Sequence, residues 1–185
     1  MNHQKASLVY IDKIKQLHDQ LGIDKAYVDK HLNLLYEEVA KEDLVLCGKD
    51  CFNRDFYLIK KAFNAWNKLF EQALADDIKL EVVSAFRSVV YQASLIEKKL
   101  LAGKSIHDII TVNAPPGYSE HHTGRALDIT TPEEKGVLTE SFENTAAFKW
   151  LSKHGAYFGF SLSYPRDNAY GYIYEPWHWC YQVGD

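Results

Sequence analysis

Long apolar runs are absent from this sequence of 185 residues. No stretch approaches the roughly 18 apolar residues of a membrane-spanning helix, so we predict no membrane span. The first twenty residues mix charged residues with aliphatic ones and lack the continuous apolar core of a signal peptide. Neither a membrane span nor an export signal is therefore visible in the sequence.

Clusters of positive charge are also absent. The net charge is −4, and the basic residues are scattered along the chain. A protein that binds nucleic acid or an anionic membrane surface usually carries a basic patch, so we expect neither kind of partner.

Cysteine is scarce, with Cys47, Cys51 and Cys180 the three that occur. An odd number of cysteines without a secretory signal favours reduced thiols. Cys47 and Cys51 are close enough in sequence to pair or to bind a metal, but no second Cys or His pair lies nearby. We therefore expect ordinary, partly buried thiols.

Internal repeats, low-complexity tracts and flexible linkers are missing too. Hydrophobic residues make up 46% of the chain and aromatic residues 14%, which is typical of a globular protein with a substantial core. We predict an N-terminal helical extension over residues 1–50 and a catalytic domain over residues 51–185, together forming one compact unit.

Apolar periodicity predicts mainly helices in the first half of the chain. One helix should run from about Leu8 and end at Gly22, and a second should begin at Asp24, with Val28, Leu32, Leu35 and Val39 on one face. The other predicted elements of this half are a helix over residues 54–75, a strand over 80–84, a helix over 89–101 and a short helix starting at Ser105.

The second half favours strands. They are expected over residues 125–130, 159–163 and 177–182, with a helix over 144–155 between the first two. Helices early and strands late, without regular βαβ alternation, predict an α+β fold with a small antiparallel sheet flanked by helices.

Two segments carry residues suited to metal chemistry. Glu175-Pro176-Trp177-His178 places a carboxylate three residues before an imidazole. On its own, this pattern also fits an aromatic strand with a buried histidine beside an exposed glutamate.

The second segment, Ser119 to Asp128, adds the adjacent His121 and His122 and a carboxylate. Asp128 sits in an apolar strand and needs a buried partner, which can be a metal, an arginine or backbone N–H groups. Gly124 allows a turn between the histidines and Asp128. Spacing alone does not choose between His121 and His122 as a ligand.

Together the two segments supply two imidazoles, a carboxylate and a spare glutamate. A catalytic zinc needs three protein ligands, one open position and a nearby base that does not bind the metal. The sequence therefore favours a zinc metallopeptidase.

These motifs resemble those of the VanY-type D-alanyl-D-alanine carboxypeptidase family, which shares a fold with the hedgehog signalling domain. The matching segments are Ser-x-His-x-x-Gly-x-Ala-x-Asp at 119–128, Glu-x-x-His at 175–178, Ser-Ala-Phe-Arg-Ser with a following Gln at 84–92, and Tyr-Phe-Gly-Phe with a following Tyr-Pro at 157–165. The resemblance covers roughly residues 55–181, with the motifs in the family's order.

The resemblance implies one zinc ion per chain, held by His121, Asp128 and His178. It further implies that Glu175 is the general base and that Arg87 contacts the substrate and stabilises the oxyanion. Gln92 and Ser119 match positions near the substrate. The implied substrate is a peptidoglycan stem peptide, cut before a terminal D-alanine. An ordinary surface salt bridge is the alternative role for Arg87.

Two positions depart from the family pattern. Phe86 stands where the family usually has tyrosine, and His122 stands where a polar residue such as glutamine is frequent. We expect His122 to be solvated, with a hydrogen-bond role behind the metal ligands as the alternative.

The alternative functions are a D-Ala-D-Ala dipeptidase, a peptidoglycan endopeptidase and a non-catalytic zinc-containing binding module. Glu175 argues against the last, because a structural zinc site needs no base. Without a visible signal, the predicted location is cytoplasmic by default, with action at the cell wall through another export or release route as the alternative.

Overall fold

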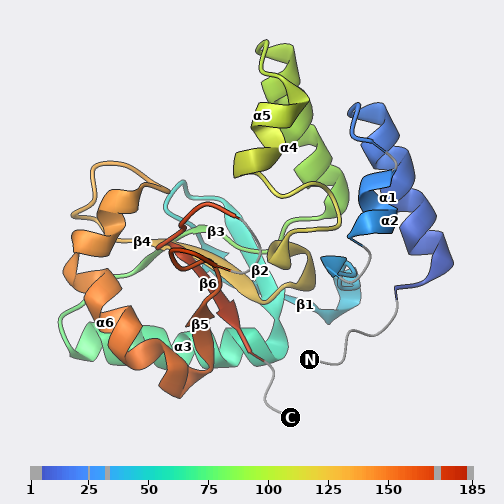
Figure 1. Ribbon diagram of the computed structural model, residues 1–185. Helices are drawn as coiled ribbons and strands as arrows, with labels where there is room; N and C mark the ends of the chain where they lie inside the picture. The colour runs from blue at the N-terminus through green and yellow to red at the C-terminus, as the bar shows by residue number, and fades with distance from the viewer. Residues whose placement is uncertain (1–5, 25, 32–33, 169–171, 183–185) are drawn as a thin grey trace. The chain divides into compact units, whose positions relative to one another are not determined.

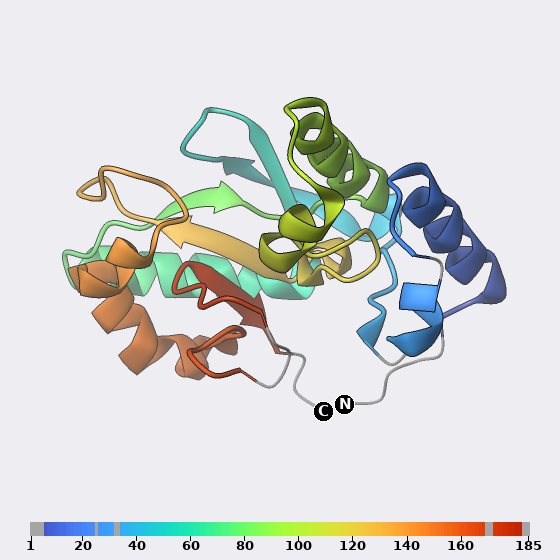
Figure 2. The ribbon, with the colours of Figure 1, turned by 45° about the horizontal axis from the view of Figure 1, so that its top comes forward.

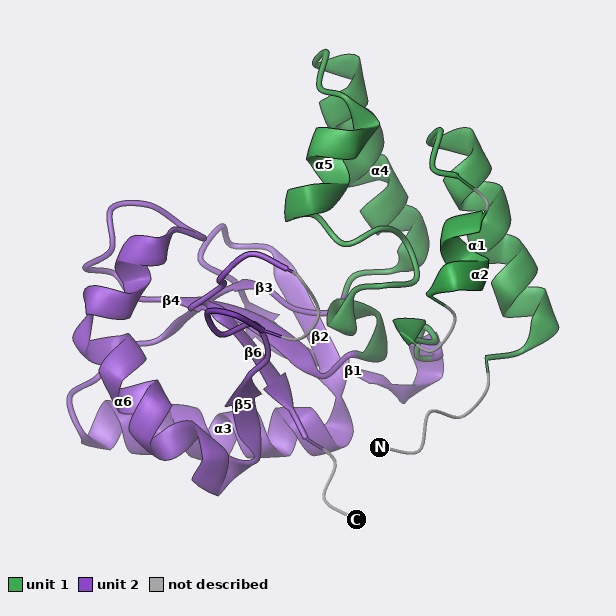
Figure 3. Ribbon diagram, in the orientation of Figure 1, with its two compact units in different colours: residues 1–39, 87–123 green, residues 40–86, 124–185 purple. Residues whose placement is uncertain are grey.

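The computed structural model describes residues 6–24, 26–31, 34–168 and 172–182, and the chain divides into two compact units (Figure 1, Figure 3). Unit 1 comprises Met1–Val39 and Arg87–Thr123, and unit 2 comprises Ala40–Phe86 and Gly124–Asp185. The predicted boundary near residue 50, between an N-terminal helical extension and a catalytic domain, stays a prediction.

Unit 1 is helical. It contains α1 (Leu8–Gln20), α2 (Ala26–Lys30), α4 (Val89–Leu101), α5 (Ile106–Val112) and the 3₁₀ turn η3 (Glu120–Thr123). The serines before α1, α4 and α5 each accept a hydrogen bond from a backbone N–H of the first helical turn. These caps satisfy N–H groups that have no partner inside the helix, and they explain why the helices begin there.

The second predicted helix is shorter than expected. α2 ends at Lys30, whereas the apolar spacing suggested a helix reaching Val39. The Tyr36 N–H donates instead to the Gly117 carbonyl at 2.8 Å, and the Val39 N–H donates to the His122 carbonyl at 2.9 Å. Tertiary hydrogen bonds thus replace helical ones after α2. Leu32, placed on the predicted helix face, lies outside the described residues.

Unit 2 begins with the turn η2 (Lys41–Asp43) and a hairpin of β1 (Leu44–Lys49) and β2 (Asp55–Ile59), followed by α3 (Lys60–Ala75). The prediction of a helix from residue 54 is therefore wrong for its first turn and a half. Phe56 and Leu58 are buried while Tyr57 between them is exposed, which is strand alternation.

Unit 2 also contains a four-stranded antiparallel sheet. Its strands are β3 (Glu81–Ser84), β4 (Ala126–Thr130), β5 (Phe160–Leu162) and β6 (His178–Tyr181), in the order β3-β4-β6-β5. The segments η4 (Glu140–Asn144), α6 (Ala146–His154) and η5 (Gly155–Phe158) come between β4 and β5. Figure 2 shows α3 running along this sheet. The predicted α+β class with a small antiparallel sheet is confirmed.

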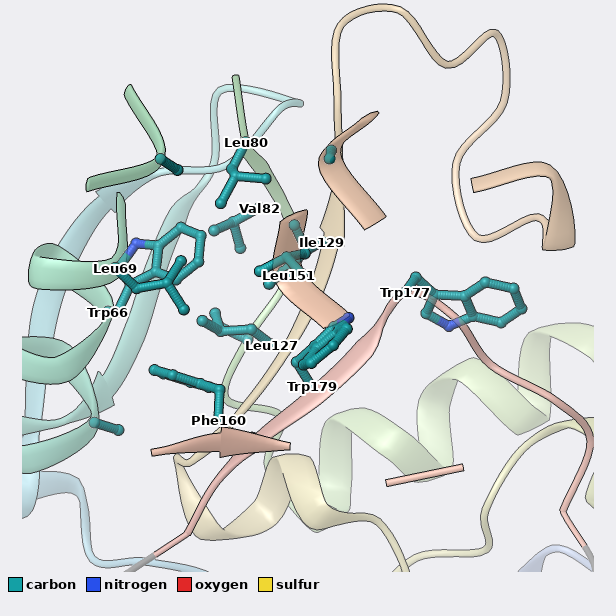
Figure 4. Close-up of a cluster of buried hydrophobic side chains, with 14 of the residues drawn as sticks. Trp66, Leu69, Leu80, Val82, Leu127, Ile129, Leu151, Phe160, Trp177 and Trp179 are labelled. Atoms are coloured by element: carbon teal, nitrogen blue, oxygen red, sulfur yellow. The ribbon is translucent and has the colours of Figure 1, made fainter. Parts of the chain in front are cut away.

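The main core of unit 2 lies between the sheet and its helices (Figure 4). Trp66 and Leu69 of α3 pack with Leu127 and Ile129 of β4 and with Leu151 of α6. Side chains alternate across a strand, so Asp128 points to the opposite face from Leu127 and Ile129. The core therefore fixes the face on which Asp128 is presented.

Two expectations from composition can also be compared with the structure. The three cysteines are free thiols, with Cys180 buried and the other two partly buried. Burial raises the pKa of Cys47 to about 11. Within the described ranges, no helix is long and apolar enough to cross a membrane.

Candidate metal centre

Asp128 and His178 face each other across β4 and β6. The two residues are register partners in the antiparallel ladder, although 50 positions separate them in sequence. The His178 Nδ1 atom lies 3.1 Å from the Asp128 Oδ1 atom, and both residues are almost completely buried. Strand register therefore brings together a carboxylate and an imidazole.

His121 completes a possible metal-binding group. One ligand atom each from His121, Asp128 and His178 lie within 4.8 Å of one another, and all three residues are buried. In the part of the chain that the structure describes, this is the one group of three or more such side chains. His122 is not in the group, so the structure favours His121 as the candidate ligand.

Gly124 shapes the chain between His121 and Asp128. Its φ of +65° lies in the left-handed region, and its carbonyl accepts the Ile59 N–H at 2.9 Å. A Cβ at this position would lie 3.0 Å from the Leu44 Cδ2 atom and 3.1 Å from the Ile59 Cγ2 atom. The turn thus requires glycine both for its conformation and for its close packing.

Glu175 lies beside His178 without belonging to the metal-binding group. Its Oε2 atom is 3.9 Å from the His178 Nδ1 atom, and its side chain is 18% exposed. The backbone N–H of His178 donates to the backbone carbonyl of Glu175 at 3.1 Å. The backbone N–H of Glu175 donates in turn to the backbone carbonyl of Tyr164 at 3.0 Å. The backbone of Glu175 is therefore held beside His178, and its carboxylate keeps access to solvent.

Tyr164 is a neighbour of the site that sequence reasoning did not assign. Its ring centroid lies 4.7 Å from that of His178, and the residue is buried. Together with its backbone contact to Glu175, this packing limits how the His178 ring can turn. The Tyr-Pro pair at residues 164–165 was the signal available in the sequence.

His122 is buried, so the expectation that it is solvated is wrong. Its exposed fraction is 0%. Its Nδ1 atom lies 2.6 Å from the Arg87 carbonyl oxygen, and its Nε2 atom lies 3.1 Å from the Gly117 nitrogen. Burial lowers the pKa of His122 to about 3, so the imidazole is neutral at pH 7.

The other predicted site residues lie in unit 1. Arg87 is partly buried, and its backbone N–H donates to the His121 carbonyl at 3.2 Å. The buried Gln92 donates from Nε2 to the Ala114 carbonyl at 2.8 Å. The Ser119 hydroxyl accepts the His121 N–H at 3.4 Å. These contacts tie the three residues to the loop that leads into η3.

Unit 2 also contains a separate pocket of about 290 Å³, formed by the β1–β2 hairpin, α3 and the start of β3. Its apolar wall includes Phe56, Trp66 and Phe70. None of the predicted catalytic, substrate-binding or metal-binding residues lines this pocket.

Comparison with known proteins adds a family match. Residues 55–185 match the family model described as "VanY: D-alanyl-D-alanine carboxypeptidase". YodJ of Bacillus subtilis (strain 168), whose name assigns it provisionally to the carboxypeptidases, is 33% identical over 127 residues. That alignment covers 68% of this chain and 46% of YodJ.

The bifunctional D-Ala-D-Ala dipeptidase and D-Ala-D-Ala carboxypeptidase VanXYC of Enterococcus gallinarum is a second relative. It is 31% identical over 134 residues, covering 70% of this chain and 69% of the relative. The chain spans less than half the length of YodJ and of the D-alanyl-D-alanine carboxypeptidase of Enterococcus faecium.

Solved structures with a similar fold include the LdcB LD-carboxypeptidase, with a TM-score of 0.69 and 32% identity over 79% of this chain and 69% of that one. VanYB in complex with D-alanine-D-alanine has a TM-score of 0.60 and 24% identity, covering 80% and 85%. A variant of the D,D-pentapeptidase VanY in complex with Zn(II) has a TM-score of 0.59 and 24% identity, covering 78% and 82%.

Proposed function

Because the chain belongs to the D-alanyl-D-alanine carboxypeptidase family, we propose that it is a zinc-dependent carboxypeptidase that removes a terminal D-alanine from peptidoglycan stem peptides. The observation that carries this proposal is the buried group of His121, Asp128 and His178, with Glu175 beside it and outside it.

The donor set fits zinc. Structural and catalytic zinc sites use imidazole and carboxylate ligands at about 2.0–2.2 Å, and a catalytic site uses three of them. Two such ligands on one tetrahedral ion lie about 3.3 Å apart, close to the 3.1 Å between the His178 and Asp128 atoms. His121, Asp128 and His178 are the proposed ligands.

Zinc at this site would supply a Lewis acid that polarises a carbonyl group and acidifies a water molecule. The Glu175 carboxylate is placed to accept a proton from an attacking water molecule and to return it to the leaving amine. The Arg87 guanidinium donates hydrogen bonds to the oxyanion that develops on the carbonyl. Gln92 and Ser119 remain proposed as residues near the substrate.

Two related activities have a specific observation in their favour. The match to LdcB, which is named as an LD-carboxypeptidase, favours removal of the terminal D-alanine of a tetrapeptide, where the cleaved bond joins an L-centre to D-alanine. The match to VanXYC, which is named as bifunctional, favours hydrolysis of free D-Ala-D-Ala as an additional activity.

Release of D-alanine from muramyl pentapeptide, muramyl tetrapeptide and free D-Ala-D-Ala tests this function and separates its forms. We expect the zinc-loaded protein to release D-alanine from at least one of the two muramyl peptides. Release from pentapeptide alone identifies a D,D-carboxypeptidase, and release from tetrapeptide an L,D-carboxypeptidase.

Glu175→Ala is the matched variant for that assay. Loss of a general base typically lowers the rate by about 10²–10⁴-fold. The variant should keep stoichiometric zinc, because Glu175 is not a proposed ligand. A zinc-loaded wild-type protein that releases no D-alanine from either muramyl peptide would contradict the carboxypeptidase function.

A further inference from the structure

The His122 side chain connects two backbone segments of unit 1, those at Arg87 and at Gly117. A carbonyl oxygen can only accept a hydrogen bond and a backbone N–H can only donate one. The Nδ1 atom of His122 therefore carries the proton that is donated to the Arg87 carbonyl. Its Nε2 atom accepts the Gly117 N–H. The buried ring thus uses both nitrogens, each in one defined role.

Two consecutive histidines hold the peptide groups of Arg87 from both sides. The Arg87 N–H donates to the His121 carbonyl at 3.2 Å, and the Arg87 carbonyl accepts from the His122 ring at 2.6 Å. Arg87 directly precedes Ser88, the N-cap of α4. Both backbone polar groups of Arg87 are therefore hydrogen-bonded, directly before the capped start of α4.

Gly117 gives the His122 ring a firm support on its other side. Gly117 has a φ of +88°, and a Cβ there would lie 2.8 Å from the Leu35 Cδ1 atom. Its carbonyl accepts the Tyr36 N–H at 2.8 Å. The Gly117 backbone is thus closely packed and hydrogen-bonded on its own account, and it supports the His122 ring nitrogen that faces away from Arg87.

We propose that His122 is a positioning residue, which places the Arg87 guanidinium for its role at the oxyanion. This inference rests on the proposed function, because it needs Arg87 to act on the substrate. Misplacing a catalytic group by about 1 Å can lower a rate by about 100-fold. A lost bond between His122 and Arg87 should therefore reduce kcat/KM while leaving the zinc ligands intact.

The chain allows a closely matched pair of variants, His122→Asn and His122→Leu. The two side chains have nearly the same shape, and both lack the atom that accepts the Gly117 N–H. Asn places an amide nitrogen where Nδ1 of histidine lies, so it can still donate to the Arg87 carbonyl, whereas Leu cannot. The difference between the two variants thus isolates the bond to Arg87.

The experiment measures kcat/KM for D-alanine release, together with zinc content, for both variants in the Arg87 and in the Arg87→Ala background. With Arg87 present, we expect His122→Asn to exceed His122→Leu by about tenfold or more. With Arg87→Ala, the two should be equal, because the group that His122 positions is gone. Equal values with Arg87 present, or the same difference in both backgrounds, would overturn the inference.

Two further results keep the test decisive. A zinc-loaded wild-type protein without activity defeats the proposed function, whereas an active wild type with indifferent variants defeats only the role of His122. If His122→Leu does not fold, the ¹⁵N spectrum of the wild-type imidazole serves instead. The proton is expected on Nδ1, and a proton on Nε2 would overturn the inference without any variant.

Discussion

The two units hold their predicted site residues by different means. In unit 2, strand register places Asp128 opposite His178, and an apolar cluster behind the sheet fixes the face of Asp128. In unit 1, buried polar side chains hold loops through individual hydrogen bonds to the backbone. These are His18 to the Pro116 carbonyl, Gln92 to the Ala114 carbonyl, and His122 to Arg87 and Gly117.

This difference separates two ways of building precision. A sheet shares the task among many equivalent backbone bonds, so no single side chain sets the register. A loop held by buried polar side chains depends on each of them, because a buried group that loses its partner is destabilising by about 1–3 kcal/mol. We therefore expect unit 2 to respond to changes in its core and ligands, and unit 1 to changes in single polar residues.

The sharpest test of unit 2 is Asp128→Asn, which keeps the shape of a proposed ligand and removes its charge. Even groups that only support a ligand typically change metal affinity by 10–100-fold, so we expect zinc affinity to fall by more than about 100-fold. Competition with a chromogenic chelator measures this.

Asp50→Asn is its control within the same unit, since Asp50 caps the hairpin turn through the Phe52 and Arg54 N–H groups and is not in the metal-binding group. Its zinc affinity should be unchanged. Wild-type zinc affinity in Asp128→Asn would remove Asp128 from the site.

Core truncation compares the apolar packing of the two units. Leu127 in unit 2 and Ile96 in unit 1 are both fully buried, but Leu127 belongs to a much larger cluster. Replacement by alanine should lower the free energy of unfolding by about 2–5 kcal/mol. We expect the larger loss for Leu127→Ala, because a small cluster can relax around the lost methyl groups. Denaturant unfolding measures both losses, and a larger loss of unfolding free energy for Ile96→Ala would contradict this comparison.

Two glycines with similar backbone conformation provide a finer comparison. Gly22 in unit 1 has a φ of +72° with open space where a Cβ would lie, whereas Gly124 in unit 2 has a φ of +65° and close neighbours. Gly22→Ala should lower the free energy of unfolding by about 1–2 kcal/mol through backbone strain alone. Gly124→Ala should add about 1–3 kcal/mol from overpacking. Equal losses in chemical denaturation would show that the neighbours of Gly124 yield easily.

The smallest expected effect concerns a buried polar residue of unit 1. Burial lowers the pKa of His18, so the unfolded chain binds a proton more readily than the folded one. Stability is therefore full above the unfolded pKa of about 6.5 and falls as the pH drops below it. One such group contributes a slope of at most about 1.4 kcal/mol per pH unit.

His18→Gln can keep the donor to the Pro116 carbonyl without titrating. Unfolding free energies measured between pH 7 and pH 5 should therefore show a shallower slope for this variant. An unchanged slope would mean that His18 does not contribute to the pH dependence.

Much of the site could be predicted from the sequence because its motifs are local. The family and the α+β fold are confirmed. His121, Asp128 and His178 do lie together as a candidate metal site. The distance between Asp128 and His178 depends on register, however, and no local pattern encodes which residues of two distant strands become partners.

The errors arose where tertiary contacts override local periodicity. Phe56 and Ile59 have helical spacing with Phe63, but the chain there forms β2, paired with β1. Leu35 and Val39 continue an apolar helical pattern, yet the backbone there is not helical. The Tyr36 N–H donates to Gly117 in the loop before η3, and the Val39 N–H donates to His122 within η3. The burial of His122 was also missed, because its ring contacts the Arg87 carbonyl and the Gly117 N–H, and no local pattern in the sequence indicates these contacts.

Zinc titration of the metal-free protein tests the central claim most directly, namely that one metal ion at His121, Asp128 and His178 makes the site active. D-alanine release from the preferred muramyl peptide would be followed as zinc is added. The predicted result is no activity without metal and a maximum at one equivalent per chain. Full activity in the metal-free protein, or saturation at any other stoichiometry, would contradict this account.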